Sequence, residues 1–275
     1  MDLHIHTTAS DGTDSPAELL RRLRAAGIRV FSVTDHDTVS GALEMESLVP
    51  EGMRFIRGIE FSCISDAGKC HILGYGYDPE HPAFLAALEE GRQLRLEKLE
   101  RRILHLRERF GVELTNRETA WLRSLPSPGK PHLGQLLVNR GLAPELGTAI
   151  RTYLNGVPGR DRIDAGTAVR AILAAGGTPV WAHPLGGEGE KRLTPERFEA
   201  QLRTLLDHGI RALECWYSRY TMAEVRFLTA KAEEHGLAVT CGSDYHGDAK
   251  PDIRLGMCNC EGIDCPILKE PGCFT

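Results

Sequence analysis

The segment "DLHIHTTASDG" (residues 2–12) places two histidines, His4 and His6, at alternate positions of an apolar run. Alternate residues of a β-strand face the same way, so the run predicts a first strand with both imidazoles on one face. Leu3 and Ile5 would then lie together on the other face. Histidines at the start of a core strand indicate that this strand builds a functional site as well as a sheet.

The composition is that of a soluble globular protein. The chain has 275 residues, of which 41% are hydrophobic, 26% charged and 6% aromatic, enough for one large core or a core with an insertion. A net charge of −5 argues against a stable complex with nucleic acid or an anionic membrane. No apolar run approaches the roughly 18 residues of a membrane span. The first residues lack a signal-peptide pattern, so we expect a cytoplasmic location, and we expect a monomer.

The eight cysteines do not require disulfides in a chain of this size. Four lie in or beside apolar runs, where a thiol acts as a small hydrophobe: Cys63, Cys70, Cys215 and Cys241. The other four gather near the C-terminus: Cys258, Cys260, Cys265 and Cys273. Their spacing is not that of paired metal knuckles, so we favour free thiols over a structural metal.

Short apolar runs alternate with helical patterns in two blocks, residues 1–80 and 166–275. In the second block the runs "TPVWAH", "RALECW" and "LAVTCGSD" follow helices expected at 166–175, 195–208 and 220–235. In the first block, "RFIRGIEFSC" and "CHILGYGY" predict a hairpin-like pair of strands. The alternation predicts βαβ units, and the number of repeats favours an α/β fold resembling a TIM barrel.

The region between the two blocks, residues 81–165, has a different pattern. Residues 81–110 form a long charged helix with apolar residues at helical spacing and many opposite charges four residues apart. Residues 111–165 continue with short helical pieces and show no strand pattern. We therefore expect an all-helical insertion on the active-site side of the barrel.

Ten polar residues stand at or near the ends of predicted strands: His4, His6, Asp11, Asp35, His36, Glu60, His71, His183, Asp244 and His246. In a βα barrel, the C-terminal ends of the strands form the catalytic face. His71, which opens its strand, is the exception, and Glu60 fits the rule less clearly. Any one of these residues alone is more often solvated or locally hydrogen-bonded. Buried together, they would leave uncompensated acids and imidazoles unless divalent cations bind both.

The motifs "DLHIHTTASDG", "TDHD", "GIEFS", "HILGY", "AHP" and "GSDYHG" occur in an order that resembles the polymerase and histidinol phosphatase (PHP) superfamily of metal-dependent phosphoesterases. The resemblance runs across nearly the whole chain. It implies a distorted seven-stranded (β/α) TIM-like barrel, residues 1–80 and 166–275, with the all-helical insertion 81–165 forming part of the substrate site. The insertion resembles that of a stand-alone bacterial subgroup that acts on nucleotides and short RNA.

The same resemblance implies two or three divalent metal ions, and the mixed ligands suit Mn, Zn or Fe. One ion would be held by His4, His6, Glu60 and Asp244. A second ion, bridged by Glu60, would be held by His71 and His183. A third position would be surrounded by Asp11, His36 and His246, although some relatives carry a histidine in place of Asp11.

The expected reaction is hydrolysis of a phosphoric ester by a hydroxide bridged between the metals. We expect catalytic roles for Asp11, His36 and Asp244, with either of the first two protonating the leaving group. Asp35 and Asp37 would orient ligand histidines or would be solvated loop acids. Substrate contacts are expected from five residues that could equally be surface groups: Lys130, His132, Arg160, Arg162 and Arg219.

The expected substrate is a small phosphorylated metabolite: a nucleotide or sugar-phosphate monoester, a 3',5'-bisphosphate nucleotide or a cyclic phosphate. The alternatives are a 5'-3' exoribonuclease on short RNA and a histidinol-phosphate phosphatase. An amidohydrolase-type zinc enzyme would commonly place a lysine between its metals, where this chain offers Glu60. A non-catalytic module would have lost ligands, and a nucleic-acid-binding protein would need a basic surface or stacking aromatics.

Overall fold

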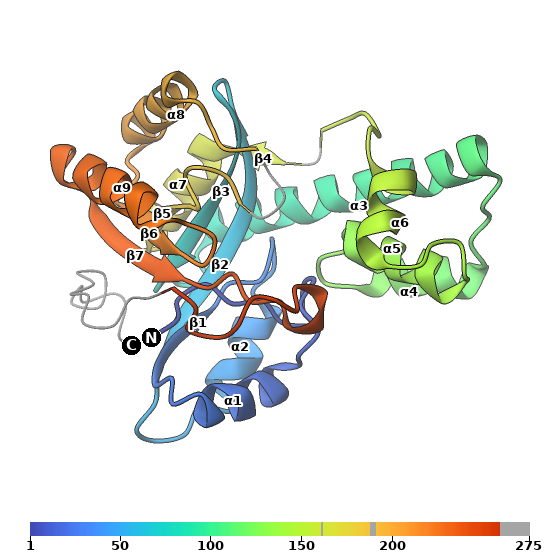
Figure 1. The fold of residues 1–275 in the computed structure, drawn as a ribbon, viewed down its shortest axis with the longest axis horizontal. Coiled ribbons are helices and arrows are strands. Elements are labelled where there is room, and N and C mark those ends of the chain that lie inside the picture. The colour runs from blue at the N-terminus through green and yellow to red at the C-terminus, as the bar shows by residue number, and fades with distance from the viewer. Residues whose placement is uncertain (161, 188–190, 259–275) are drawn as a thin grey trace.

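The computed structural model describes residues 1–160, 162–187 and 191–258. A curled sheet forms the body of the molecule, with helices packed on its outer side and a group of helices extending to one side (Figure 1). The sheet has seven strands: β1 (Val30–Val33), β2 (Arg54–Ser65), β3 (Gly68–Tyr75), β4 (Ile163–Asp164), β5 (Thr178–Ala182), β6 (Ala212–Tyr217) and β7 (Ala238–Gly242). The strands run in the order β1-β2-β3-β5-β6-β7, and β4 pairs with β2. The predicted distorted α/β barrel is confirmed.

Residues 2–6 connect the two edge strands of this sheet. Asp2 pairs in parallel with Phe31 of β1, and Ile5 pairs in parallel with Tyr245, just beyond β7. The backbone N–H of Leu3 also donates to the carbonyl of Cys241 in β7 (3.2 Å). The N-terminal segment therefore closes the sheet, but through isolated bridges rather than as the regular first strand that the sequence predicted.

The sequence predicted that Leu3 and Ile5 lie on the same face of this segment, and that prediction is wrong. Leu3 packs inside the barrel with Leu73 and Val180, whereas Ile5 packs outside it with Leu19 of α1 (Pro16–Ala25). The two aliphatic side chains thus face opposite sides. The segment bonds to a different neighbour on each side, and this irregular pairing breaks the two-residue period.

The hairpin-like pair is confirmed, and its direction explains the position of His71. β3 runs antiparallel to both β2 and β5, with His71 opposite Ser62 and Ala182. The other strand pairs of the sheet are parallel. The beginning of β3 therefore lies beside the C-terminal ends of its neighbours, so a residue that opens this strand reaches the same mouth.

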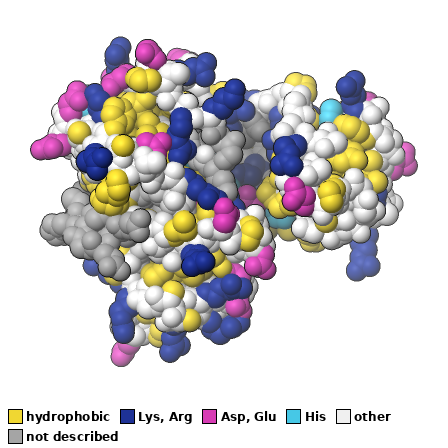
Figure 2. Space-filling model, in the orientation of Figure 1, with side chains coloured by type: hydrophobic (Ala, Val, Ile, Leu, Met, Phe, Trp, Pro, Cys, Tyr) yellow, Lys and Arg dark blue, Asp and Glu magenta, His cyan; other side chains and the backbone are white. Residues whose placement is uncertain are grey.

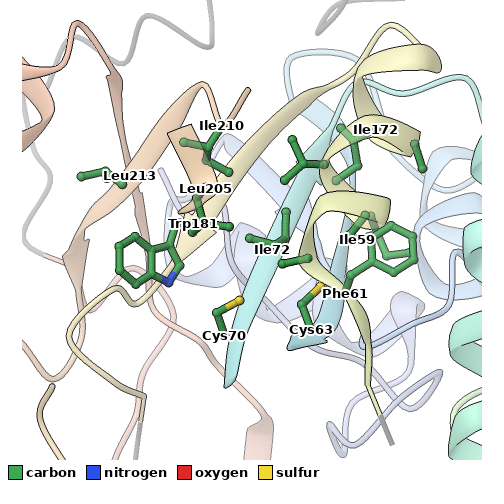
Figure 3. Close-up of a cluster of buried hydrophobic side chains, with 14 of the residues drawn as sticks. Ile59, Phe61, Cys63, Cys70, Ile72, Ile172, Trp181, Leu205, Ile210 and Leu213 are labelled. Atoms are coloured by element: carbon green, nitrogen blue, oxygen red, sulfur yellow. The ribbon is translucent and has the colours of Figure 1, made fainter. Parts of the chain in front are cut away.

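The main hydrophobic core lies between the sheet and its outer helices: α7 (Ala165–Ala174), α8 (Pro195–His208) and α9 (Met222–Glu234). Figure 3 shows strand residues such as Phe61, Ile72 and Trp181 with Ile172 of α7 and Leu205 of α8. A smaller cluster under α1 and α2 (Ser40–Glu46) covers the other end of the sheet. The barrel interior has two layers. The lower layer, away from the C-terminal ends of the parallel strands, is apolar. The upper layer, at those ends, is formed by polar side chains.

The helices beside the barrel are α3 (Pro82–Phe110), α4 (Asn116–Ser124), α5 (Lys130–Asn139) and α6 (Leu146–Ala149), followed by a π-helical turn at Ile150–Leu154. They pack around their own cluster of leucines, which includes Leu99, Leu106, Leu122, Leu133 and Leu137. The expectation of no strand in residues 111–165 is wrong for β4, whose two residues pair with Cys63 and Ile64 of β2. Two residues are too few to show a period.

Cys63, Cys70, Cys215 and Cys241 are buried free thiols, as expected, and so is Cys258. The other three cysteines of the C-terminal group, Cys260, Cys265 and Cys273, lie outside the described residues. Within the described parts of the chain, no helix is long and apolar enough to cross a bilayer.

Candidate metal centre

One carboxylate, Glu60 of β2, lies at the middle of the polar upper layer. Its Oε2 atom is 3.3 Å from His4 Nε2, 3.2 Å from His6 Nε2 and 3.0 Å from His36 Nδ1. His4 and His6 come from the closing segment, and His36 follows β1 and bridges Glu60 through its backbone. A single oxygen therefore faces three imidazoles that come from two neighbouring segments.

The other oxygen of Glu60 faces the far side of the barrel mouth. Oε1 is 2.9 Å from His71 Nδ1 and 3.1 Å from His183 Nε2. The two imidazole nitrogens are 3.2 Å apart. Glu60 is thus shared between two groups of nitrogen donors, in the position that the resemblance gave to a bridging carboxylate.

Asp244, after β7, completes the first group of donors. Its Oδ1 atom is 3.6 Å from His4 Nε2 and 3.4 Å from His6 Nε2. Its Oδ2 atom accepts hydrogen bonds from the Tyr217 hydroxyl (3.0 Å) and from Lys250 Nζ (2.7 Å). One carboxylate oxygen is therefore held by two donors while the other faces the imidazoles.

Asp11 lies among the donors that the resemblance gave to a third metal. Its Oδ1 atom is 3.3 Å from His246 Nε2 and 3.8 Å from His6 Nδ1, and its Oδ2 atom is 4.0 Å from His36 Nε2. The structure brings Asp11, His36 and His246 together as expected and adds His6 to the group.

These donors fit divalent cations. Three groups have ligand atoms that all lie within 4.8 Å of one another: His4–His6–Asp244, His36–Glu60–His71 and His6–Asp11–His36–His246. Several of the buried atoms have no hydrogen-bond partner: His4 Nε2, His6 Nε2, His36 Nδ1, Asp11 Oδ1 and Glu60 Oε2. A buried polar atom without a partner costs about 1–3 kcal/mol, and coordination of a cation would remove that cost.

The pKa values of the ionisable groups in this donor set shift in different directions. Burial opposes the charged form of the imidazoles, but the facing carboxylates raise the pKa of His4 and His183 and raise the pKa of His6 to about 9. These three imidazoles would therefore release a proton when a cation binds.

Burial opposes ionisation of Glu60, but the imidazoles of His36 and His71 help to hold its pKa well below its usual range. Burial lowers the pKa of His71 and of His246 to about 4. Ionised carboxylate and neutral imidazole are the forms that bind metal.

The backbone is strained where the polar residues leave their strands. Asp37, His183 and Asp244 have φ values of 50°, 29° and 59°, in the left-handed region that residues other than glycine rarely adopt. Such conformations cost of order 1–3 kcal/mol each and gather at functional sites.

Glu214 of β6 is a part of the centre that the sequence analysis did not include. It is buried, and its Oε1 atom is 2.9 Å from His4 Nδ1. Its Oε2 atom accepts from the backbone N–H of His183 (2.8 Å). Glu214 thus fixes the orientation of His4 and the backbone of His183. An acid inside the apolar run "RALECW" was the available signal.

Asp35 and Asp37 act one step away from the imidazoles. Asp35 accepts from the backbone and hydroxyl of Thr7 and from the Ser10 hydroxyl, and Ser10 Oγ lies 3.3 Å from His6 Nδ1. Asp37 accepts from Arg95 Nε (2.5 Å). Asp35 therefore holds the loop after the N-terminal segment, and Asp37 orients the guanidinium of Arg95.

A pocket with many cations opens beside Asp11, His36 and His71 and has a volume of about 230 Å³. Its basic side chains come from β3, from α3, from the start of α5 and from the segment just before β4: Lys69, Arg95, Lys98, Arg102, Lys130 and Arg162. We call it the cationic pocket. Figure 2 shows Lys and Arg side chains on both sides of the recess between the helices and the barrel.

The predicted substrate contacts lie in three kinds of place. Lys130 and Arg162 line the cationic pocket. His132 lines a neighbouring hollow. Arg160 is paired with Glu90 (2.9 Å), and Arg219 is paired with Asp252 (2.6 Å). Neither of these arginines is among the described residues that line the cationic pocket.

Lys69, Arg95, Lys98 and Arg102 line the same pocket and were not predicted. Lys98 and Arg102 are only 6% and 7% exposed. In the sequence they lie on a helix rich in charges of both signs, where a solvated face is the usual outcome. Arg95, Lys98 and Arg102 are spaced by three and four residues on one face of α3, and this spacing was the only signal for them.

Comparison with known proteins supports this account. The PHP domain family matches residues 2–121. A 3',5'-nucleoside bisphosphate phosphatase from Chromobacterium violaceum is 29% identical over 261 residues, covering 93% of this chain and 90% of that protein. A 5'-3' exoribonuclease from Haemophilus influenzae is 31% identical over 254 residues, covering 89% of each. A phosphoribosyl 1,2-cyclic phosphate 1,2-diphosphodiesterase from Eggerthella lenta is 30% identical, covering 90% of this chain and 94% of that protein.

A solved structure gives the same result for the fold. A protein from Bifidobacterium adolescentis, described as a metal-dependent phosphoesterase, superposes with a TM-score of 0.82 at 26% identity, covering 93% of this chain and 90% of that one. The match therefore includes the helical region as well as the barrel. This chain belongs to the PHP family of metal-dependent phosphoesterases.

Proposed function

We propose that this protein hydrolyses a small phosphorylated metabolite, with a nucleotide carrying 3' and 5' phosphates as the preferred substrate. One observation carries the proposal: two of the three groups of metal donors reach, through Asp11, His36 and His71, a pocket lined by six Lys and Arg side chains. Metal donors alone fit many hydrolases. The adjoining cations favour a substrate with more than one phosphate charge.

The three donor groups would hold two or three ions. We propose Mn, Zn or Fe, because the groups mix imidazole with carboxylate, whereas Mg prefers oxygen ligands alone. When bound, such ions supply Lewis-acid activation of water and of the phosphoryl group. Glu60 and Asp244 would hold the donor sets in place, and Glu214 would keep His4 oriented.

The side chains of this chain would bind and orient the rest of the substrate. Arg95 is held by Asp37 and by the Ser62 hydroxyl (2.8 Å), so its guanidinium is already positioned at the pocket wall. Lys130, at the start of α5, and Arg162, just before β4, also line the pocket. A second phosphate bound here would keep the scissile phosphate at the metal donors.

Asp11 and His36, like His71, belong to the donor groups and also line the cationic pocket. Each is part-exposed, unlike His4 and Glu60, which lie fully inside the barrel mouth. We propose that one of them delivers a proton to the departing oxygen of the ester, because a leaving alkoxide requires one.

The main alternative is trimming of short RNA from its 5' end, the activity named for the Haemophilus relative. The cationic pocket would then hold the phosphate that follows the cleaved bond. Both functions use the same metal donors, and they differ in whether the substrate extends beyond one nucleotide. Substrate length is therefore the variable to test.

The test is a phosphate-release and product assay with Mn²⁺ on four substrates: adenosine 3',5'-bisphosphate, a cyclic phosphate, histidinol phosphate and a 5'-phosphorylated oligoribonucleotide. We expect the highest kcat/KM on the bisphosphate. The variants His4→Ala and Asp244→Asn should lose at least about 1000-fold in kcat/KM, and His235→Gln, just after the end of α9, serves as a histidine control. Higher kcat/KM on the oligonucleotide would establish the alternative, and no hydrolysis of any ester would refute the proposal.

A further inference from the structure

A second hollow adjoins the metal donors on the side opposite the main cations. It has a volume of about 540 Å³ and lies between the helical region and the loops at the barrel mouth. Trp121 of α4, His132 of α5 and Leu146 of α6 line its helical side. Asp11 and Pro251 line its barrel side. We call it the tryptophan pocket.

The two pockets meet but have opposite character. Asp11 and Pro131 line both of them. The described residues that line the tryptophan pocket include no Lys or Arg, and they include Glu145 and Asp248 as well as Asp11. A phosphate is therefore disfavoured in this pocket and favoured in the cationic pocket. A ligand that bridges them would need one anionic end and one uncharged, ring-like end.

Trp121 presents an aromatic surface at this place. Its side chain is 42% exposed, whereas Trp181 is buried at 2%. The indole stands nearly perpendicular to the His132 ring, with centroids 6.2 Å apart and an angle of 71°. An exposed tryptophan edged by a second ring provides a stacking face for a flat heterocycle.

His132 is held in one orientation beside this face. Its Nδ1 atom accepts the backbone N–H of Gly129 (3.1 Å), which leaves the proton on Nε2. Burial lowers the pKa of His132, so the ring is neutral near pH 7. It therefore suits contact with an uncharged base better than contact with a phosphate, the role that the sequence analysis expected.

We propose that the tryptophan pocket binds the nucleobase of the substrate, with the base stacked on Trp121 and the phosphates at the metal donors and the cationic pocket. This inference rests on the proposed function, because it takes the substrate to be a phosphate ester bound at those donors. It adds where the base of that nucleotide binds and why an ester without a base would bind less well. It also makes Trp121 a specificity-determining residue.

The first experiment measures binding without turnover. Adenosine 3',5'-bisphosphate is titrated into chelator-treated protein and followed by tryptophan fluorescence and by calorimetry, with ribose 5-phosphate as the probe lacking a base. We expect quenching by the nucleotide that is lost in Trp121→Phe, and nucleotide affinity about 5- to 100-fold weaker in Trp121→Ala. Trp121→Phe should keep most of the affinity, because a phenyl ring still stacks.

Phe110→Ala is the matched control, since Phe110 is a 40% exposed aromatic side chain of the same helical region outside this pocket. It should leave both affinities unchanged. Equal weakening of nucleotide and ribose 5-phosphate binding by Trp121→Ala would overturn the inference, as would unchanged nucleotide affinity in that variant.

The second experiment separates this inference from the proposed function. In the Mn²⁺-loaded enzyme, Trp121→Ala should raise KM for the nucleotide by the same factor and leave kcat/KM for ribose 5-phosphate within about twofold. If no ester is hydrolysed while the fluorescence result holds, the proposed function fails and the base site stands. If esters are hydrolysed and Trp121→Ala lowers kcat/KM equally for both, the base site fails.

Discussion

Glu214 illustrates how a side chain outside the set of metal donors determines what that set can do. It is fully buried, with one oxygen near His4 Nδ1 and the other on the backbone of His183. These contacts favour a proton on Nδ1 of His4, so that a neutral His4 would offer its Nε2 lone pair to a cation beside Glu60. A carboxylate in this position also raises the basicity of the imidazole.

We expect Glu214→Gln to weaken metal binding about 10- to 100-fold, because the amide keeps the shape but lacks the charge that supports His4. Competition titration against a chromogenic chelator measures the affinity directly. Glu196→Gln, on the exposed first turn of α8, serves as the control and should change nothing. Unaltered metal affinity in Glu214→Gln would show that His4 is oriented by other contacts.

Gly242 at the end of β7 is the second residue on which the centre depends. A methyl group placed there would lie 2.1 Å from His4 Cβ and 2.7 Å from Glu214 Oε1. The first of these contacts is far inside van der Waals distance, so the N-terminal segment would have to move away from β7.

Gly242→Ala should therefore lower both stability and metal affinity, with stability reduced by about 1–3 kcal/mol for an overpacked site. Urea unfolding measures the first effect and chelator competition the second. Gly27→Ala is the control. A methyl group at Gly27 would have no atom within 4 Å, and the residue has a φ of +71°, so this variant carries backbone strain but no clash. A normal metal affinity in Gly242→Ala would contradict the proposed closeness of the two segments.

At the scale of elements, the helical region depends on leucines buried between its helices. Leu106 of α3 is fully buried in that cluster, whereas Leu104 of the same helix is 42% exposed. We expect Leu106→Ala to lower the free energy of unfolding by about 2–5 kcal/mol, since it leaves a cavity. Leu104→Ala should cost less than about 1 kcal/mol. Urea denaturation followed by circular dichroism compares the two, and equal losses would place Leu106 outside the packed core.

The elements that the sequence predicted well are those with long periodic patterns. α3, α7, α8 and α9 begin and end within a few residues of their expected bounds, because each carries an apolar stripe and most end at a glycine or a cap. β4 was missed because two residues show no period. The N-terminal segment was predicted as a regular strand, because its alternation of Leu, His, Ile and His imitates one.

The sequence pointed to some of the residues that cluster at the barrel mouth and not to others, for a related reason. Histidines and acids at strand ends are unusual enough to stand out, so residues such as His4, Glu60 and Asp244 were identified from type and position alone. Four of the six pocket cations were not, because residues such as Lys98 and Arg102 resemble the many solvated charges of α3. Only the packing of α3 against the barrel distinguishes the buried face from the solvated one.

At the scale of the whole molecule, metal binding should contribute to folding stability. The donors come from segments far apart in the sequence, such as His4 and Asp244, and meet only in the folded chain, so ions would bind the folded state far better than the unfolded one. At a free metal concentration about 100 times Kd, the gain is roughly 2.7 kcal/mol.

Differential scanning calorimetry with and without Mn²⁺ tests this expectation. Chelation should lower Tm in the native protein, and the shift should be much smaller in His4→Ala. An identical metal-induced shift in both proteins would mean that the stabilising ions bind elsewhere.

The closure of the sheet by residues 2–6 has a consequence for the order of events during synthesis. His4 and His6 are translated about 240 residues before their partners Asp244 and His246. Until β7 and these partners are made, residues 2–6 lack their neighbour on that side and the set of ligands is incomplete. Metal loading is therefore a late step that follows translation of β7, and it marks the completion of the barrel.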